Sequence, residues 1–184
     1  MKEKLVEFLA ILPPKPPTMP RPRVKWKPQD ASCFKINFDE AIFRNENKNG
    51  IGVVIRDHTG SIIASLAQLI SLALQPVENE AIATARALEF GNEISISEAV
   101  LEGDSELIIE SLKVGGNTIA SVKPLIQDAI IFSSFYSKLL YSHCRRDGNK
   151  LAHSLARYSI NVSDYVVWME EVQRDLANLA NQVQ

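Results

Sequence analysis

The chain has 184 residues, of which 46% are hydrophobic, and a formal net charge of −2. This length allows one well-buried core but not two comfortable domains. No run of about eighteen apolar residues occurs, and the amino terminus has no small-residue cleavage site, so the pattern argues against a membrane-spanning or secreted protein. Cys33 and Cys144 are far apart and lack metal-ligand spacing. They are expected to be free thiols of an intracellular protein, with the compartment, cytoplasmic or nuclear, left open.

The first 28 residues are expected to form a flexible, proline-rich segment. Residues 13–28 hold most of the nine prolines, and prolines remove backbone donors and restrict φ, which favours an extended linker. Residues 2–12 have helical spacing of apolar side chains, but a lone helix of this length is marginal in water.

Three strands joined by short loops are predicted next. Apolar and polar residues alternate strictly over 33–39, which is typical of a strand that ends near Asp39. A polar turn at 44–50 leads into a second strand, GIGVVIRD, and the turn DHTG leads into a third, SIIASLAQLI. Short connections of this kind predict an antiparallel meander.

The second half of the chain alternates helices and strands. A helix is predicted over 77–93, with Pro76 as its start signal. The segment SEAVLEGDS is then a short strand, and the helix SELIIESLKV after it ends at a glycine pair. A strand, a helix and a second strand in succession predict a parallel pair with a right-handed crossover. A helix over 122–133, a strand over 136–143 and a helix over 149–160 follow.

The predicted fold is therefore α/β, with a five-stranded mixed sheet, three antiparallel strands and then parallel strands, flanked by helices. We expect this domain to span residues 29–162. Residues 163–184 show amphipathic helical spacing and are predicted to form a closing helix, which packs back on the domain or binds a protein partner.

Three acidic residues are candidates for a shared site. Asp39 and Asp104 each end a strand, and Glu80 lies near the start of the helix between those strands. If the strands are parallel neighbours, the carboxylates emerge at one sheet edge, where ligands of open α/β sheets collect. Taken singly, each acid is more typical of a helix cap or a solvated strand end. Together they would repel unless a cation intervened, and oxygen ligands select Mg²⁺ or Mn²⁺.

Four segments carry a resemblance to a known family. In order and rough spacing they resemble type 1 ribonuclease H, and more closely the plant branch of ribonuclease H-like proteins related to retrotransposon reverse transcriptases. The similarity extends over about residues 24–172. The segments are INFDEA at 36–41, NEAIATARALE at 79–89, VLEGDS at 100–105 and SHCRRDGNKLAHSLA at 142–156.

The resemblance implies a ribonuclease H-like fold and roles for individual residues. Asp39, Glu80 and Asp104 match three metal-binding carboxylates, and Glu80 would also contact a 2′-hydroxyl of the substrate. His143 matches a mobile catalytic histidine. Asn149 matches an asparagine that supports the substrate loop.

Two positions depart from the family pattern. His153 occupies the place of the fourth carboxylate, where it would offer a neutral nitrogen ligand without negative charge. Glu40 stands where the family usually has glycine, and it adds bulk and charge beside Asp39.

Two functions from different classes remain open at this point. The first is an endonuclease that cleaves the RNA strand of an RNA–DNA hybrid by two-metal-ion hydrolysis with Mg²⁺ or Mn²⁺, weakened by the loss of the fourth carboxylate. The second is a catalytically silent nucleic-acid-binding or protein-interaction module. His153, Glu40 and the acidic net charge favour the second, because proteins that grip nucleic acid usually present basic surfaces. The basic residues Lys138, Arg145, Arg146 and Lys150 are either such a surface or a solvated loop. No Gly-rich phosphate loop or nucleophile elbow indicates another enzyme chemistry.

Overall fold

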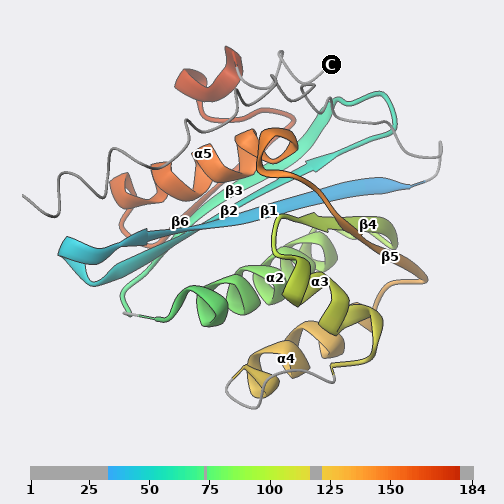
Figure 1. Cartoon of the computed structure of the whole chain (residues 1–184). Coiled ribbons are helices and arrows are strands. Elements are labelled where there is room, and N and C mark those ends of the chain that lie inside the picture. Colours follow the sequence, from blue (N-terminus) through green and yellow to red (C-terminus); the bar gives the residue numbers. More distant parts are fainter. Residues whose placement is uncertain (1–32, 73, 117–121, 179–184) are drawn as a thin grey trace, which may run out of the picture.

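The computed structural model describes residues 33–72, 74–116 and 122–178. These residues form an α/β structure around a mixed sheet of six strands in the order β5-β4-β1-β2-β3-β6 (Figure 1). The proline-rich linker and the short helix expected within residues 1–28 lie outside the described residues. No helix among the described residues has the length and apolar content that a membrane span requires.

The first three strands form the antiparallel meander that the sequence predicts. They are β1 (Phe34–Phe43), β2 (Lys48–Arg56) and β3 (Ile62–Ile70). β1 continues past Asp39, because its last residues pair with the start of β2 as far as Phe43 opposite Lys48. The short 3₁₀ turn η1 (Arg44–Glu46) closes this hairpin, helped by Asn47 at a φ of 51°.

The second half of the chain also follows the predicted order. Helix α2 (Pro76–Glu93) crosses over to β4 (Glu98–Gly103), which pairs in parallel with β1. Helices α3 (Glu106–Lys113) and α4 (Lys123–Ser133) lead to β5 (Lys138–His143), which pairs in parallel with β4. The turn η2 (Arg146–Gly148) and helix α5 (Lys150–Tyr158) follow.

The closing helix predicted from residue 163 is wrong over its first part. Residues Tyr165–Met169 form strand β6, which pairs antiparallel with β3, and the sheet therefore has six strands instead of five. The run YVVWM combines β-branched and aromatic residues that favour strands. The free edge of β3 offers it a ladder of backbone hydrogen bonds. The 3₁₀ turn η3 (Ser159–Asn161) precedes β6, and the 3₁₀ turn η4 (Arg174–Leu176) follows it.

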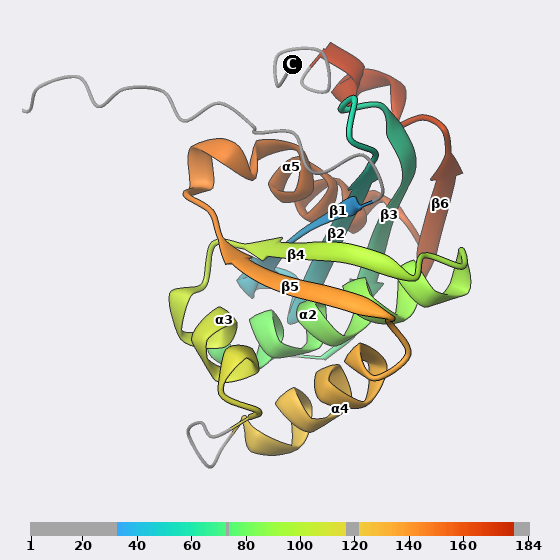
Figure 2. The ribbon, with the colours of Figure 1, turned by 90° about the vertical axis from the view of Figure 1, so that its right-hand side faces the viewer.

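Helices cover both faces of the sheet. Figures 1 and 2 show α2, α3 and α4 on one side and α5 on the other. Ile36 and Phe38 of β1 belong to the larger core cluster with the apolar face of α2, including Leu88. Leu151 and Leu155 of α5 pack with Val54 in a second cluster on the opposite face.

Helix α5 lies unusually close to β2 because of a glycine. A Cβ atom at Gly52 would meet the carbonyl oxygen of Ala152 and the amide nitrogen of Ala156. Gly52 is also the β2 partner of Asp39. The close contact therefore brings α5 to the part of the sheet that carries the first acidic residue.

Candidate active site

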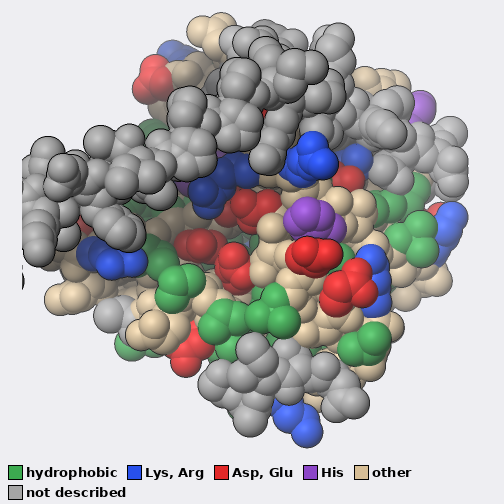
Figure 3. All heavy atoms as spheres, in the orientation of Figure 1, with side chains coloured by type: hydrophobic (Ala, Val, Ile, Leu, Met, Phe, Trp, Pro, Cys, Tyr) green, Lys and Arg blue, Asp and Glu red, His purple; other side chains and the backbone are tan. Residues whose placement is uncertain are grey.

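The acidic candidates come from three elements that meet where β1 and β4 separate. The parallel pairing of these strands extends to Asn37 opposite Glu102, two residues before Asp39 and Asp104. Glu80 lies in the second turn of α2, the crossover helix between the two strands. Figure 3 shows acidic side chains gathered on this face, with Lys or Arg side chains beside them.

The charge of Asp104 acts on both of the other carboxylates. Burial raises the pKa of Asp39 to about 7, and the charge of Asp104 contributes to the rise. Burial also raises the pKa of Glu80; a hydrogen bond with Ser105 opposes this rise, and the charge of Asp104 adds to it. The structure therefore brings Asp39, Glu80 and Asp104 into one neighbourhood.

Asp39 is almost fully enclosed by protein. Only 3% of the residue is exposed. Its Oδ1 atom accepts a hydrogen bond from the backbone N–H of Glu40 at 2.8 Å, and its Oδ2 atom lies 3.0 Å from Nδ1 of His153. Burial lowers the pKa of His153, and the charges of Arg146 and Arg157 lower it further. With the carboxyl pKa raised and the imidazole pKa lowered, the pair favours a protonated carboxyl beside a neutral imidazole over a carboxylate–imidazolium ion pair.

Glu40 is part of the same electrostatic cluster. Its Oε2 atom accepts a hydrogen bond from Nδ2 of Asn79 at 2.9 Å. Burial raises the pKa of Glu40, and the charges of Glu80 and Asp104 raise it further. The hydrogen bond from Asn79 lowers it. Asn79 is fully buried, and the sequence pattern did not single it out; its place beside Glu80 was the only available signal.

Asp104 contacts residues from the segment between β5 and α5. Its Oδ2 atom lies 3.4 Å from Nε of Arg146. Its backbone carbonyl oxygen lies 3.2 Å from Nε2 of His143, an exposed residue at the end of β5. His143 therefore stands at the border of the cluster, open to solvent.

Asn149 has a positioning role in the structure. It is 1% exposed, and its Nδ2 atom donates a hydrogen bond of 2.7 Å to the backbone carbonyl of Phe38. This bond ties the start of α5 to the residue just before Asp39. The Oδ1 atom of Asn149 is buried and has no hydrogen-bond partner among the described residues.

Comparison with known proteins identifies the family. The model of the reverse transcriptase-like family matches residues 37–159, a range that contains every site residue described above. The chain belongs to the reverse transcriptase-like family. No match is found among curated protein sequences.

Solved structures place this reverse transcriptase-like chain among type 1 ribonuclease H-like domains. Ribonuclease H1 from Halobacterium salinarum has 22% sequence identity and a TM-score of 0.64, and the similarity covers 70% of this chain and 97% of that one. The ribonuclease H domain of Rv2228c from Mycobacterium tuberculosis has 21% identity and a TM-score of 0.62 over 70% and 93% of the chains. LC11 ribonuclease H1, isolated from compost and solved with an RNA/DNA hybrid, has 25% identity and a TM-score of 0.60 over 70% and 96%.

The carboxylate oxygens of the acidic cluster suit a hard cation, although the side chains are not already arranged as a metal site. Carboxylate oxygens are the ligands that Mg²⁺ and Mn²⁺ prefer. Within the described ranges, no three acidic, histidine or cysteine side chains are already arranged to hold an ion. Asp39 contacts His153, and Asp104 contacts Arg146. These contacts would have to change before both carboxylates faced one cation.

Cys33 is buried and Cys144 is partly buried, and no disulfide joins them. Burial raises the pKa of Cys144 to about 12, and nearby carboxylates contribute to the rise. A thiol with this pKa stays protonated at neutral pH. Cys144 is therefore not a nucleophile of the neighbouring site.

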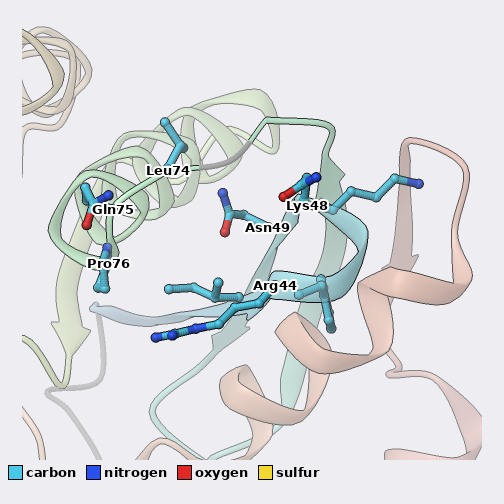
Figure 4. Close-up of a pocket in the computed structure, with 9 residues that line it drawn as sticks. Arg44, Lys48, Asn49, Leu74, Gln75 and Pro76 are labelled. Carbon is cyan, nitrogen blue, oxygen red and sulfur yellow. The ribbon is translucent and has the colours of Figure 1, made fainter.

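A polar pocket lies beside the start of α2. Its volume is about 300 Å³, and Figure 4 shows Asn49 between the β1–β2 hairpin and the start of the helix at Gln75 and Pro76. Arg44 and Lys48 also line it and bring positive charge. Asn49 is fully buried, and its Oδ1 atom has no partner among the described residues. The pocket therefore offers a hydrogen-bond acceptor at Asn49 beside two positively charged side chains.

Proposed function

We propose that the chain is an endonuclease that hydrolyses the RNA strand of an RNA–DNA hybrid. The observation that carries this proposal is that Asp39 of β1, Glu80 of α2 and Asp104, just after β4, lie in one neighbourhood, where the charge of Asp104 acts on the other two carboxylates. The family membership and the ribonuclease H fold support it. The hybrid present with LC11 ribonuclease H1 indicates the class of nucleic acid.

Mg²⁺ or Mn²⁺ is the proposed cofactor, held by Asp39, Glu80 and Asp104 together with His153. When bound, the ions would supply an activated water and neutralise charge on the leaving oxygen. The buried Asp39 favours such a cation, because its carboxylate is costly to ionise without a nearby positive charge. His153 replaces an oxygen donor by a nitrogen donor and removes one negative charge, so we propose weaker activity that favours Mn²⁺.

The surrounding side chains have distinct proposed roles. Glu80 contacts a 2′-hydroxyl of the RNA strand, which distinguishes RNA from DNA. His143 is exposed beside Asp104 and assists proton transfer or product release. Asn149 positions the turn that follows β5 and carries Arg146, through its bond to Phe38. The pocket at Arg44 and Lys48 would accept part of the nucleic-acid backbone.

A hybrid-cleavage assay tests the proposal. Purified protein is incubated with a labelled RNA–DNA hybrid in Mg²⁺ and, separately, in Mn²⁺. We expect cleavage of the RNA strand, and we expect Asp39→Asn to abolish it. Asp128→Asn on the exposed surface of α4 is the matched control, since it removes the same charge away from the cluster. Equal cleavage by the wild type and Asp39→Asn would show that the assignment is wrong.

A catalytically silent module is the second candidate function. The contact between Asp39 and His153 favours it, because that contact satisfies a buried carboxyl without any metal. Thermal melting separates the two functions. A working site should be stabilised by added Mn²⁺ through mass action, whereas a silent site should show no shift.

Other features of the proposal rest on the sequence. We propose that residues 29–162 together with β6 form the ribonuclease H-like unit, and that the chain is related to plant retrotransposon proteins. A protein partner at the C-terminal segment also remains a prediction.

A further inference from the structure

Arg146 stands at the entrance of the acidic cluster. Its side chain is 70% exposed, and its Nε atom lies 3.4 Å from Oδ2 of Asp104. It belongs to η2, the turn between β5 and α5. None of the roles assigned above uses this guanidinium.

The charge of Arg146 reaches the whole cluster. Burial is the largest influence on the pKa values of Asp39, Glu40 and Glu80 and raises all three, while Arg146 opposes the rise at each. Arg146 also contributes to the lowered pKa of His153. One cation therefore faces groups from β1, α2, β4 and α5.

The backbone of Arg146 is held by a hydrogen bond, while most of its side chain is exposed. The N–H of Asn149 donates to the carbonyl of Arg146 at 3.0 Å, and Asn149 is itself bonded to Phe38. An ion pair as exposed as the one with Asp104 contributes little to stability, so stability alone does not explain the position of Arg146. A guanidinium has five donors in a planar fork that matches phosphate oxygens. The contact with Asp104 leaves most of them available.

We propose that Arg146 binds a phosphate of the nucleic-acid strand at this site. The inference rests on the proposed function, because it assumes that nucleic acid approaches the acidic cluster. A strand at that position brings negative charge towards several carboxylates. An adjacent cation that is anchored by its backbone would offset this repulsion and fix the position of the strand.

The neighbouring Arg145 offers a matched control. It is exposed, lies one residue earlier in the same segment and, in the described part of the chain, forms no ion pair. Arg145→Ala and Arg146→Ala therefore make the same change in net charge. Circular dichroism verifies that both variants fold.

Binding of a fluorescent RNA–DNA hybrid is measured by anisotropy in EDTA, where cleavage does not interfere. We expect Arg146→Ala to weaken binding about tenfold, which corresponds to the loss of a charge-assisted hydrogen bond. Arg145→Ala should weaken it by less than about threefold. Arg146→Lys should recover only part of the loss, because an ammonium lacks the planar fork.

The outcomes separate this inference from the nuclease proposal. If the wild type binds the hybrid and Arg146→Ala binds as tightly as Arg145→Ala, the inference is wrong, whatever the cleavage assay shows. If Arg146→Ala loses affinity but the wild type cleaves in neither metal, the phosphate contact stands and the nuclease proposal fails. A wild type that does not bind the hybrid overturns both.

Discussion

Nδ1 of His153 lies 3.0 Å from Oδ2 of Asp39. The residue at the fourth carboxylate position of the family pattern is thus in direct contact with the first acidic residue. Gly52 makes this contact possible by allowing α5 to approach the sheet. In the proposed metal site, the imidazole would stand where an acid would hold a cation jointly with Asp39.

Restoring an acid at this position should strengthen metal binding. We expect His153→Asp to raise the apparent affinity for Mn²⁺ by about tenfold, because it adds a negative oxygen ligand. Without metal the same variant should be less stable than the wild type, since two carboxylates then face each other. Melting temperatures measured over a metal titration report both effects. His153→Asn, which removes the imidazole without adding charge, should show no gain; an equal gain in both variants would contradict the explanation.

The metal-free protein should lose stability as the pH rises from about 4 to about 7. Asp39 has a pKa near 7 in the folded state, compared with a usual value of 3.8. In that interval the folded state holds a proton that the unfolded state has released, so the free energy of unfolding falls with increasing pH. We expect this group to contribute roughly 2–4 kcal/mol over the interval. His153, whose pKa is lowered, acts in the opposite direction below its usual pKa of 6.5.

Urea denaturation in EDTA at several pH values isolates the contribution of Asp39. The Asp39→Asn variant lacks the titrating group, so its stability should depend less on pH than that of the wild type. Parallel pH profiles for the two proteins would rule out the burial effect assigned to Asp39.

Gly52 should be sensitive to the smallest substitution. A methyl group there would meet the backbone of α5 at Ala152 and Ala156. We expect Gly52→Ala to reduce the free energy of unfolding by about 1–3 kcal/mol, as overpacking does in other cores. Gly115→Asn is the control, because Gly115 has open space around its Cβ position and a φ of 71°, which asparagine tolerates. A larger loss at position 115 would contradict the proposed close packing.

Strand β6 should be more sensitive to a charge at its middle, where it packs against the core, than at its exposed first residue. Val167 packs against the main core, whereas Tyr165 is 57% exposed. Val167→Asp should cost about 2–3 kcal/mol, because it buries an unpaired polar group. Tyr165→Asp should cost less than about 1 kcal/mol. Chemical denaturation of both variants checks this difference, and similar losses would argue against the observed pairing with β3.

The sequence by itself determined the order of the elements through the chain from β1 to α5, and it indicated which acids end strands. Period-two alternation in β1 and helical spacing in α2 are local signals, so they could be read without coordinates. The crossover predicted that β4 pairs in parallel with one of the first three strands, and the structure shows that this strand is β1. Given that pairing, Asp39, Glu80 and Asp104 could be expected at one edge.

Tertiary structure alone decided what surrounds those acids. The spacing in Tyr165–Met169 suited a helix, and the open edge of β3 made it a strand. The contacts of His153 with Asp39 and of Arg146 with Asp104 join residues far apart in the chain. Such contacts depend on how closely the helices and loops pack against the sheet, and this packing depends on long-range complementarity that no local periodicity records.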